Sequence, residues 1–449
     1  MPYRFRRSGS DAAMTSVVRG IAWVGILIGI CVAPLVFALM STDRAGQGFW
    51  TDFSVALGFV GLALMGIEFA LVARVKPVAE PFGTDALIDF HRQIGYAGLA
   101  FVLIHVALSA EWKQVKSFTP AETPARVLFG AVAAAALVAL VITSVWRRQL
   151  RLSYELWQVL HAVLAVIAVV AALVHVLLVN YYVDSIWKQV LWSLMTAAFI
   201  WLIVWARLLR PLQMRRRPWT VERITAERDR TTVLTLRPAG HDGLRFEPGQ
   251  FAWITVGRSP FSVTSHPFSF SSSAETKGSV EVAIKDAGDF SSSVAAVKPG
   301  TAVYVDGPHG VFSIDEYEGA GFCLIAGGVG IAPVLSMLET LADRGDVRPV
   351  VLFAGNRNWD SVIFRDRIDE VATRLNMKVV HALEEPPPHW TGETGYLTAH
   401  IFIRHLPAGF QRFQSFACGP KQMLDAVEAA LVQIGAPADR VHTERFDWV

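Results

Sequence analysis

The stretch HAVLAVIAVVAALVH, residues 161–175, has a histidine at each end of thirteen residues that are all alanine, valine, leucine or isoleucine. A helix turns about 100° and rises about 1.5 Å per residue, so the steps from His161 to His175 make almost four turns and roughly 21 Å. Both imidazoles therefore lie on one face of an apolar helix. The stretch HRQIGYAGLAFVLIH, residues 91–105, repeats this spacing with His91 and His105.

The composition indicates a protein that lies partly in a membrane. Hydrophobic residues make up 53% of the 449 residues and charged residues 18%, which is too apolar for a wholly soluble protein. Six apolar stretches before residue 210 are each close to the ~20 residues that a helix needs to cross a bilayer. We therefore expect six transmembrane helices, at about 17–42, 53–73, 91–110, 126–146, 156–180 and 188–208.

The charges of the loops predict the orientation of these helices. Basic residues gather before the first helix and after the second, fourth and sixth, while the other loops contain few. The positive-inside rule then places both termini, and all residues after 217, in the cytoplasm. The first apolar stretch is too long for a cleaved leader. Cys31, Cys323 and Cys418 show no metal-binding spacing, which suits a reducing compartment.

This orientation sets the depth of each histidine. Both histidine-bearing helices run outward, so His91 meets His161 near the inner side and His105 meets His175 near the outer side. Imidazole is a common axial ligand of haem iron, and ionisable side chains inside a membrane are usually functional. A lone membrane histidine can instead hydrogen-bond a neighbouring helix, and a zinc site needs further ligands. Four histidines at duplicated spacing favour two b-type haems.

Glu68 is the charged residue that interrupts the second apolar stretch. It lies within two turns of Arg74 in the sequence. Two interpretations stay open: Glu68 faces the interior or the inner interface and pairs with a basic residue, or it takes part in proton movement.

The second half of the chain has a different pattern. Short alternating strands, TTVLTLRP (231–238), QFAWITV (250–256), SVEVAIK (279–285) and TAVYVDGP (301–308), indicate a small antiparallel barrel. From about residue 318, buried strands alternate with amphipathic helices, as in a parallel α/β sheet. The expected fold is multidomain: an all-α six-helix transmembrane bundle (1–217), an antiparallel β-barrel domain (218–316) and an α/β domain with a parallel sheet (317–449).

The turn AGGVGIAP, residues 326–333, lies between a predicted strand and a predicted helix. Gly327, Gly328 and Gly330 permit close backbone approach, and the helix that begins near Ile331 presents free amides and its positive dipole end to a pyrophosphate. A tight turn without a ligand is the alternative. The position between strand and helix favours a nucleotide site.

Several motifs in order resemble those of ferredoxin–NADP reductase-type flavoproteins: HPFSFSS (266–272), KDAGDFSSSV (285–294), GPHGVF (307–312), GGVGIAP (327–333), GNR (355–357) and CGPKQML (418–424). Together with RLSYELWQVLH (151–161) and the doubled histidine pairs, the chain resembles the bacterial branch of the ferric reductase and NADPH oxidase superfamily. The resemblance covers about residues 15–449.

The resemblance implies an FAD-binding barrel domain and an NAD(P)H-binding α/β domain. In the flavin motif, the hydroxyl of Ser269 would approach the reactive flavin nitrogen, beside His266, Pro267 and Phe268. The residues implied at the FAD pyrophosphate are Gly288, Phe290, Ser291 and Ser292, with Lys285 opening that motif. Those implied at the nicotinamide-nucleotide pyrophosphate are Gly327, Gly328, Gly330 and Pro333.

The resemblance also implies how the nicotinamide reaches the flavin. Cys418, Gly419 and Pro420 match the segment that brings the two rings together, and a C-terminal aromatic, Phe446 or alternatively Trp448, would shield the flavin. Ser269, Cys418 and Phe446 are the residues expected to act in catalysis. Packing or capping roles are the alternative for any one of these residues.

Arg357, just beyond the strand VVLFAG, is placed to meet the 2′-phosphate of NADPH, because a guanidinium offers forked donors to phosphate oxygens. An arginine that is merely solvated at a strand end is the alternative. NADPH is therefore the expected donor, with NADH left open.

The family resemblance implies a transmembrane electron transferase in the plasma membrane of a bacterium, with both termini and the flavin and nucleotide domains cytoplasmic. Electrons would pass from NADPH through FAD and two haems, whose iron ligands are His91, His105, His161 and His175, to an acceptor outside. Oxygen, giving superoxide, is favoured. A ferric chelate and an extracytoplasmic redox protein are the alternatives. The bilayer is the expected environment, and no nucleic acid is expected as a partner.

Overall fold

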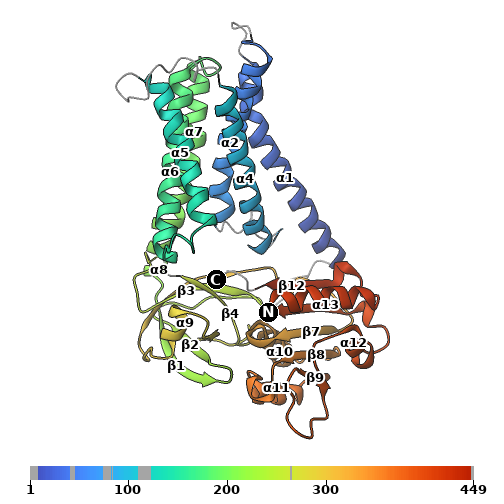
Figure 1. Cartoon of the computed structure of the whole chain (residues 1–449). Helices are drawn as coiled ribbons and strands as arrows, with labels where there is room; N and C mark the ends of the chain where they lie inside the picture. Colours follow the sequence, from blue (N-terminus) through green and yellow to red (C-terminus); the bar gives the residue numbers. More distant parts are fainter. Residues whose placement is uncertain are drawn as a thin grey trace. The chain divides into compact units, whose positions relative to one another are not determined.

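A computed structural model describes residues 9–40, 46–73, 82, 84–109, 123–262 and 265–445. Contacts within the chain divide it into two units: Ser16–Pro211 forms a helical unit, and Leu212–Val449 belongs to a second unit that contains both sheets (Figure 1). Each unit is described by itself below. The expected domain boundaries at residues 217 and 316 stay predictions.

Long helices make up the helical unit. They are α1 (Gly9–Leu39), α2 (Phe49–Val72), α4 (Thr84–Leu108), α5 (Ala125–Val145), α6 (Tyr154–Val179) and α7 (Ile186–Val204). After α7 the chain continues through a π-helical turn, η2 (Trp205–Leu209), into α8 (Arg210–Arg215). Among the described residues, five helices are long and apolar enough to cross a membrane, and α4 is not one of them. Five apolar helices are thus established, and the sixth span stays a prediction.

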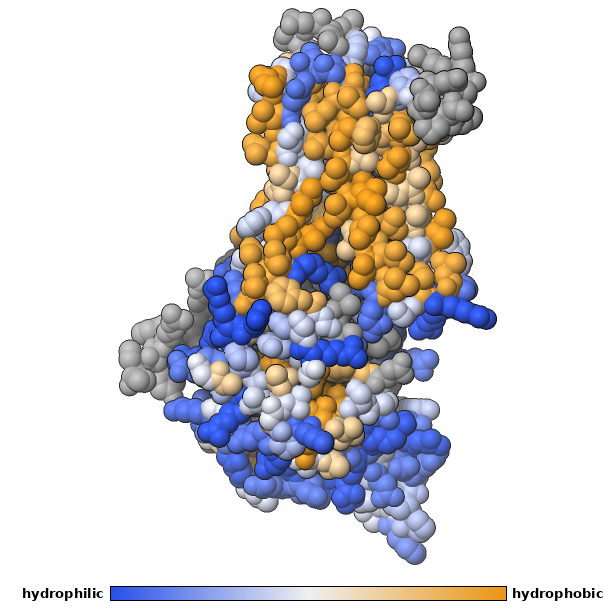
Figure 2. Space-filling model, turned by 90° about the vertical axis from the view of Figure 1, so that its left-hand side faces the viewer, coloured by the Kyte–Doolittle hydropathy of each residue, from blue (hydrophilic) through white to orange (hydrophobic). Residues whose placement is uncertain are grey.

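The surface of the helical unit suits contact with lipid. Large apolar side chains such as Ile21, Val163 and Leu194 are exposed on it, and Figure 2 shows hydrophobic residues over most of the visible face of the helices. Inside the unit, α2 packs along α4, and α5 packs along α6. Buried side chains such as Phe59 and Trp192 fill the space between helices, with their rings 5.2 Å apart.

An antiparallel sheet of six strands opens the second unit. The strands are β1 (Trp219–Glu227), β2 (Thr231–Pro238), β3 (Phe251–Val256), β4 (His266–Ser269), β5 (Val280–Lys285) and β6 (Ala302–His309), in the order β4-β3-β6-β1-β2-β5. An isolated bridge joins Phe270, just after β4, to Val282 of β5, so the two edges of the sheet are connected. The short helix α9 (Asp289–Val294) follows β5. Leu234, Ile254 and Val282 are fully buried in this sheet's core.

A parallel sheet of six strands follows, with helices on both faces. Its strands are β7 (Phe322–Gly327), β8 (Val350–Asn356), β9 (Met377–Leu383), β10 (Glu393–Thr394), β11 (Gln414–Gly419) and β12 (Val441–Arg445), in the order β10-β9-β8-β7-β11-β12. The helices are α10 (Ile331–Asp343), α11 (Arg365–Ala372), α12 (Ala399–His405) and α13 (Lys421–Gln433), and the 3₁₀ turns are η3 (Gly328–Gly330), η4 (Trp359–Ser361), η5 (Phe410–Arg412) and η6 (Ala438–Arg440). All residues of β7 and β11 are buried, as expected when both faces are covered.

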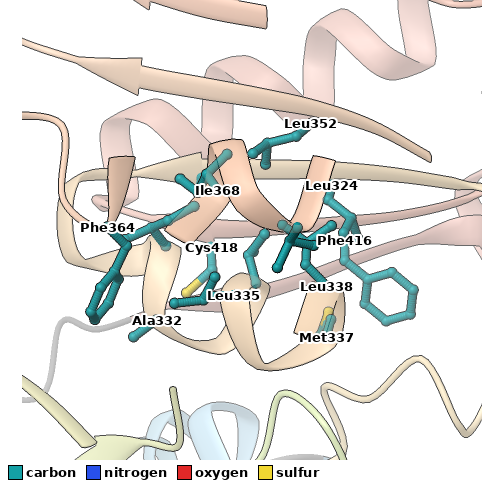
Figure 3. Close-up of a cluster of buried hydrophobic side chains, with 14 of the residues drawn as sticks. Leu324, Ala332, Leu335, Met337, Leu338, Leu352, Phe364, Ile368, Phe416 and Cys418 are labelled. Carbon is teal, nitrogen blue, oxygen red and sulfur yellow. The ribbon is translucent and has the colours of Figure 1, made fainter. Parts of the chain in front are cut away.

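One face of the parallel sheet fixes the position of α10. Leu324, Leu352 and Phe416 project from three strands toward Leu335 and Leu338 of α10 (Figure 3). This packing holds the start of α10 at the carboxyl end of β7, which is the edge of a parallel sheet where ligands bind.

Candidate functional site

The helical unit brings the four histidines together as two pairs. The ring centroids of His91 and His161 lie 6.1 Å apart, and those of His105 and His175 lie 6.3 Å apart. A bond from imidazole nitrogen to a metal is about 2.0–2.1 Å long. Since that nitrogen lies roughly 1 Å from the ring centroid, two imidazoles on one metal ion have centroids about 6 Å apart. Each pair has the separation that a shared ion requires.

Backbone carbonyls hold the second ring nitrogen of one pair. The Nδ1–H of His105 donates to the carbonyl of Ser54 on α2 at 2.8 Å, and the Nδ1–H of His175 donates to the carbonyl of Arg126 on α5 at 2.7 Å. The hydroxyl of Ser54 also lies 3.2 Å from Nδ1 of His105. These bonds fix each ring and leave Nε2 as the nitrogen that can bind a metal.

Side chains hold the second ring nitrogen of the other pair. The hydroxyl of Ser144 on α5 donates to the carbonyl of Leu140 at 2.7 Å, so it accepts from Nδ1 of His161 at 3.1 Å and from the indole of Trp157 at 3.3 Å. Nδ1 of His91 contacts the carboxylate of Glu68 on α2. Glu68 therefore faces the interior and pairs with a histidine, while Arg74 lies outside the described residues.

Two glycines make room for the imidazoles of the His105/His175 pair. A Cβ on Gly58 would lie 3.1 Å from Nδ1 of His105, and a Cβ on Gly130 would lie 2.9 Å from Nδ1 of His175. Larger residues would push each ring away from its carbonyl partner. The glycines thus let α2 and α5 approach the histidine-bearing helices closely.

The donor set suits haem better than a bare metal ion. In the described part of the chain, no group of three or more His, Cys, Asp or Glu side chains is placed to hold a metal. Structural zinc takes four protein ligands, and catalytic zinc usually takes three. The two imidazoles of each pair would instead supply the two protein ligands that a haem iron takes.

The flavin motif of β4 lies against the segment around α9. The ring of His266 stacks on Phe290 at 4.2 Å between centroids, and Phe268 stacks on the same ring at 6.0 Å. Pro267 lies between them in the strand. The Ser269 side chain is 4% exposed, and its hydroxyl has no hydrogen-bond partner in the described structure. A buried hydroxyl of this kind suits a polar atom of a bound ligand.

The serines after Gly288 hold the turn at the start of α9. The hydroxyl of Ser291 accepts from the backbone N–H groups of Ala287 and Gly288 at 2.8 and 2.9 Å. The hydroxyl of Ser292 donates to Asp286 at 2.5 Å. Their first role is thus to shape this turn, and their contact with FAD pyrophosphate stays a prediction.

Lys285 connects the flavin motif with the glycine turn. It ends β5, contacts Asp229, and its Nζ lies 4.0 Å from the position that a Cβ on Gly328 would occupy. An ammonium group is therefore present at the turn where a pyrophosphate is expected.

The glycine turn and the CGP segment lie side by side. β7 and β11 are neighbouring parallel strands, with Ala326 opposite Cys418. A Cβ on Gly330 would lie 2.2 Å from the carbonyl oxygen of Cys418, and one on Gly419 would lie 3.2 Å from the amide nitrogen of Gly327. Only glycines permit this approach. Pro333 follows in the first turn of α10, and Pro420 precedes α13.

Cys418 contributes its backbone to this edge, and its side chain lies elsewhere. The side chain is fully buried and lies in the apolar cluster under α10 (Figure 3). Nearby, at the carboxyl ends of β7 and β8, is a pocket lined by Ala326, Gly328, Ile331, Ala354, Asn356, Val362, Ile363 and Ile368. The catalytic role expected of Cys418 stays a prediction.

Arg357 is held by a carboxylate at the end of β8. Its guanidinium donates to Glu385 through Nε at 3.1 Å and Nη2 at 3.0 Å. The hydrogen bond and charge of Glu385 raise the pKa of Arg357. Both side chains are mainly exposed, so a phosphate can reach Arg357 but must compete with Glu385.

The C-terminal strand β12 pairs in parallel with β11 and brings Glu444 opposite Cys418. The tail that follows therefore starts beside the CGP segment. Phe446 and Trp448 lie outside the described residues, and the choice between them stays a prediction.

Sequence reasoning missed the residues that hold the imidazoles: Ser54, Gly58, Gly130 and Ser144, together with the contact between Glu68 and His91. A signal exists for the pair on α2. Ser54 and Glu68 are the two polar residues of the stretch 53–73, and they have the same separation as His91 and His105. Equal separation on antiparallel neighbouring helices allows both contacts at once.

Three family models match the chain. The model described as "Ferric reductase like transmembrane component" matches residues 57–172, "FAD-binding domain" matches residues 219–313, and "Oxidoreductase NAD-binding domain" matches residues 324–429. His91, His105 and His161 lie within the first range, and His175 lies just beyond its end.

Curated relatives match about half of the chain. It is 29% identical over 246 residues to the reductase component of propane 2-monooxygenase of Rhodococcus jostii, covering 53% of this chain and 64% of that protein. It is 31% identical over 243 residues to the flavohemoprotein of Deinococcus radiodurans, covering 51% and 59%. It is 28% identical over 224 residues to ferredoxin–NADP reductase B of Sorangium cellulosum, covering 48% and 91%. The chain spans less than two thirds of the length of the first two relatives.

We expect Gly330→Ala to destabilise the protein by about 1–3 kcal/mol, because the new methyl group would meet the backbone of Cys418. It should also weaken NADPH binding. Gly327→Ala should cost less, since its Cβ would meet the flexible Met423 thioether, with Sδ at 2.4 Å. Thermal unfolding and NADPH titration measure both effects. Equal losses in the two variants would contradict this account of the turn.

We expect Arg357→Ala to lower the preference for NADPH over NADH by roughly tenfold, the scale of one charge-assisted hydrogen bond. Glu385→Gln should act in the opposite direction, because it removes the carboxylate that competes with the 2′-phosphate. The ratio of kcat/KM values for the two donors measures the preference. An unchanged ratio in Arg357→Ala would show that the arginine is merely solvated.

Proposed function

Because this chain has the domain architecture of the ferric reductase and NADPH oxidase superfamily, we propose that it carries electrons across a membrane. The chain is an oxidoreductase that takes electrons from NADPH, with NADH as the alternative, and passes them through FAD and two b-type haems. The acceptor lies on the opposite side of the membrane. The membrane is the plasma membrane of a bacterium, with both termini and the nucleotide-binding half in the cytoplasm.

The two facing imidazole pairs are the observation that carries this proposal. Their centroid separations of 6.1 and 6.3 Å suit one iron each, and every Nδ1 is engaged by a neighbouring helix. His91 and His161 would hold one haem, and His105 and His175 the other. When bound, FAD takes up a hydride from the nicotinamide and supplies single electrons to haem iron.

The residues of the reductase half bind and align the two redox rings. Ser269 offers a buried hydroxyl from β4, and Lys285 places an ammonium group near the turn of Gly327, Gly328 and Gly330. That turn gives a pyrophosphate close access to backbone amides at the start of α10. The alignment of the flavin and nicotinamide rings therefore depends on the packing that holds α10 against the parallel sheet.

The order of the two histidine pairs follows from the chain. α7 runs back from the connection at residues 180–185 and ends at the same end of the helical unit as His161. The charge of Arg207, just after α7, acts on that histidine. The chain leaves the helical unit at this end, so the His91/His161 pair is the first to receive electrons.

Oxygen, reduced to superoxide, is the acceptor that we propose. The connection between α6 and α7, residues 180–185, lies at the His105/His175 end and is too short to form a docking surface of its own. A small diffusible acceptor fits such an end. A ferric chelate and an extracytoplasmic redox protein are the remaining candidates.

We expect the purified protein to bind two low-spin b-type haems per chain. His91→Ala or His161→Ala should remove one, and His105→Ala or His175→Ala the other, because each iron loses one axial ligand. The haem-to-protein ratio, measured as the pyridine haemochrome, should fall from about two to about one. His400→Ala, an exposed histidine of α12, is the control and should keep both. A ratio of one in the unaltered protein would contradict the pairing.

The acceptor is tested in proteoliposomes supplied with NADPH. We expect reduction of cytochrome c that superoxide dismutase suppresses, and its loss in His105→Ala. A ferric chelate added to the same vesicles should leave most of the superoxide signal. If NADPH oxidation instead depends on the chelate and yields ferrous iron without superoxide, the protein is a ferric reductase.

A further inference from the structure

We propose that Glu68, through its contact with His91, lowers the reduction potential of the His91/His161 haem site below that of the His105/His175 site. This inference rests on the proposed function, since it concerns the two haems. According to this inference, the Glu68 carboxylate sets the difference in reduction potential that makes electron transfer favourable in one direction along the helical unit.

The partners of the four imidazoles differ in one respect. His105 and His175 donate from Nδ1 to backbone carbonyls, and His161 donates to the hydroxyl of Ser144. Among the contacts that the described residues make with the four imidazoles, the one at His91 is made by a carboxylate, that of Glu68. Each imidazole is thus contacted by a neighbouring helix, and in the described part of the chain the contact at His91 is the one that brings a formal negative charge.

The surroundings strengthen the effect of this charge. The side chains of Glu68 and His91 are 15% and 26% exposed, and the rest of the stretch 53–73 carries no other charged residue. In such a medium, a charge acts over several ångströms with far less screening than in water.

A carboxylate at Nδ1 changes the electronic character of the ligand. A carboxylate in contact with Nδ1 makes the imidazole a stronger donor through Nε2, which would stabilise ferric over ferrous iron. The negative charge favours the more positive oxidised state as well. With the lower potential at the His91/His161 site, transfer of one electron from a haem held there to a haem held by His105 and His175 would be energetically downhill.

Among the described residues, other charges also lie near the two sites. Arg207 acts on His161, but no contact joins its guanidinium to either ring of that pair, whereas Glu68 touches His91 directly. At the other end, the Asp52 carboxylate accepts hydrogen bonds from the Tyr182 hydroxyl and from the backbone N–H of Gln47. The proposal therefore rests on the direct contact of Glu68 with His91.

The test is a spectroelectrochemical titration of the haems in the full-length protein. The unaltered protein should show two potentials, and His91→Ala, which retains the His105/His175 haem, identifies the higher one. Glu68→Gln keeps the size of the side chain and removes its charge. We expect it to raise only the lower potential, reducing the equilibrium constant between the sites about tenfold, or about 59 mV for a one-electron couple.

Two further variants sharpen the result. Glu155→Gln removes an exposed carboxylate near the start of α6 and should leave both potentials unchanged. Ser144→Asp places a carboxylate beside Nδ1 of His161 and should lower the lower potential further. It also decides the question if Glu68→Gln loses its haem, because a potential that does not fall in Ser144→Asp overturns the proposal.

The outcomes separate this inference from the proposed function. Two haems whose potentials both stay unchanged in Glu68→Gln, or shift equally, overturn the role of Glu68 and leave transmembrane electron transfer standing. Protein that binds no haem overturns both. A rise confined to the potential of the His91/His161 site supports both.

Discussion

An imidazole buried in a membrane bundle has two nitrogens to satisfy and little water to satisfy them with. In this chain the neighbouring helix takes one nitrogen of each ring: α2 bonds the two histidines of α4, and α5 bonds the two histidines of α6. These contacts are consistent with the pairing of α2 with α4 and of α5 with α6, and with glycine at positions 58 and 130. They also leave Nε2 of each ring as the nitrogen that can bind a metal. The facing pairs are a consequence of these bonds rather than of contacts between the histidines themselves.

In the reductase half, the corresponding close contact is made by the backbone rather than by side chains. β7 and β11 are adjacent parallel strands, and the turn after one must pass within contact distance of the carbonyl at the end of the other. Gly330 permits this passage, and the buried face beneath α10 keeps it in place. The ammonium group of Lys285 lies near this edge, and the buried hydroxyl of Ser269 lies in the antiparallel sheet of the same unit.

Much of this arrangement could be predicted from the sequence, because helical period fixes both the face and the height of a side chain. The spacing of His161 and His175, repeated by His91 and His105, predicts which imidazole meets which once the loop charges have given the orientation of the helices. The glycine turn was predictable from its three glycines and from its position between a strand and a helix. The ends of the helices were less predictable. The expected helix at about 91–110 begins at Thr84 as α4, because helical hydrogen bonding continues into polar residues that precede the apolar stretch.

The missing parts have physical reasons. Every residue has a backbone carbonyl, so the residue type at position 126 does not indicate that its carbonyl is the partner of His175. The pairing of Arg357 with Glu385 depends on the register of β8 and β9, which residue types alone do not determine. The contact of Glu68 with His91 was within reach, because Ser54 and Glu68 repeat the histidine spacing, but that repeat has meaning only once α2 is known to pack along α4.

The pairing of α2 with α4 and of α5 with α6 has a consequence for biogenesis. Each helix pair carries one histidine of both imidazole pairs, and contacts within the helix pair orient it. A haem bound as proposed would join the two helix pairs. Histidines held by such contacts would lose little conformational entropy on binding a cofactor. Maturation of the chain in the membrane would then be limited by the supply of haem rather than by the folding of its binding sites.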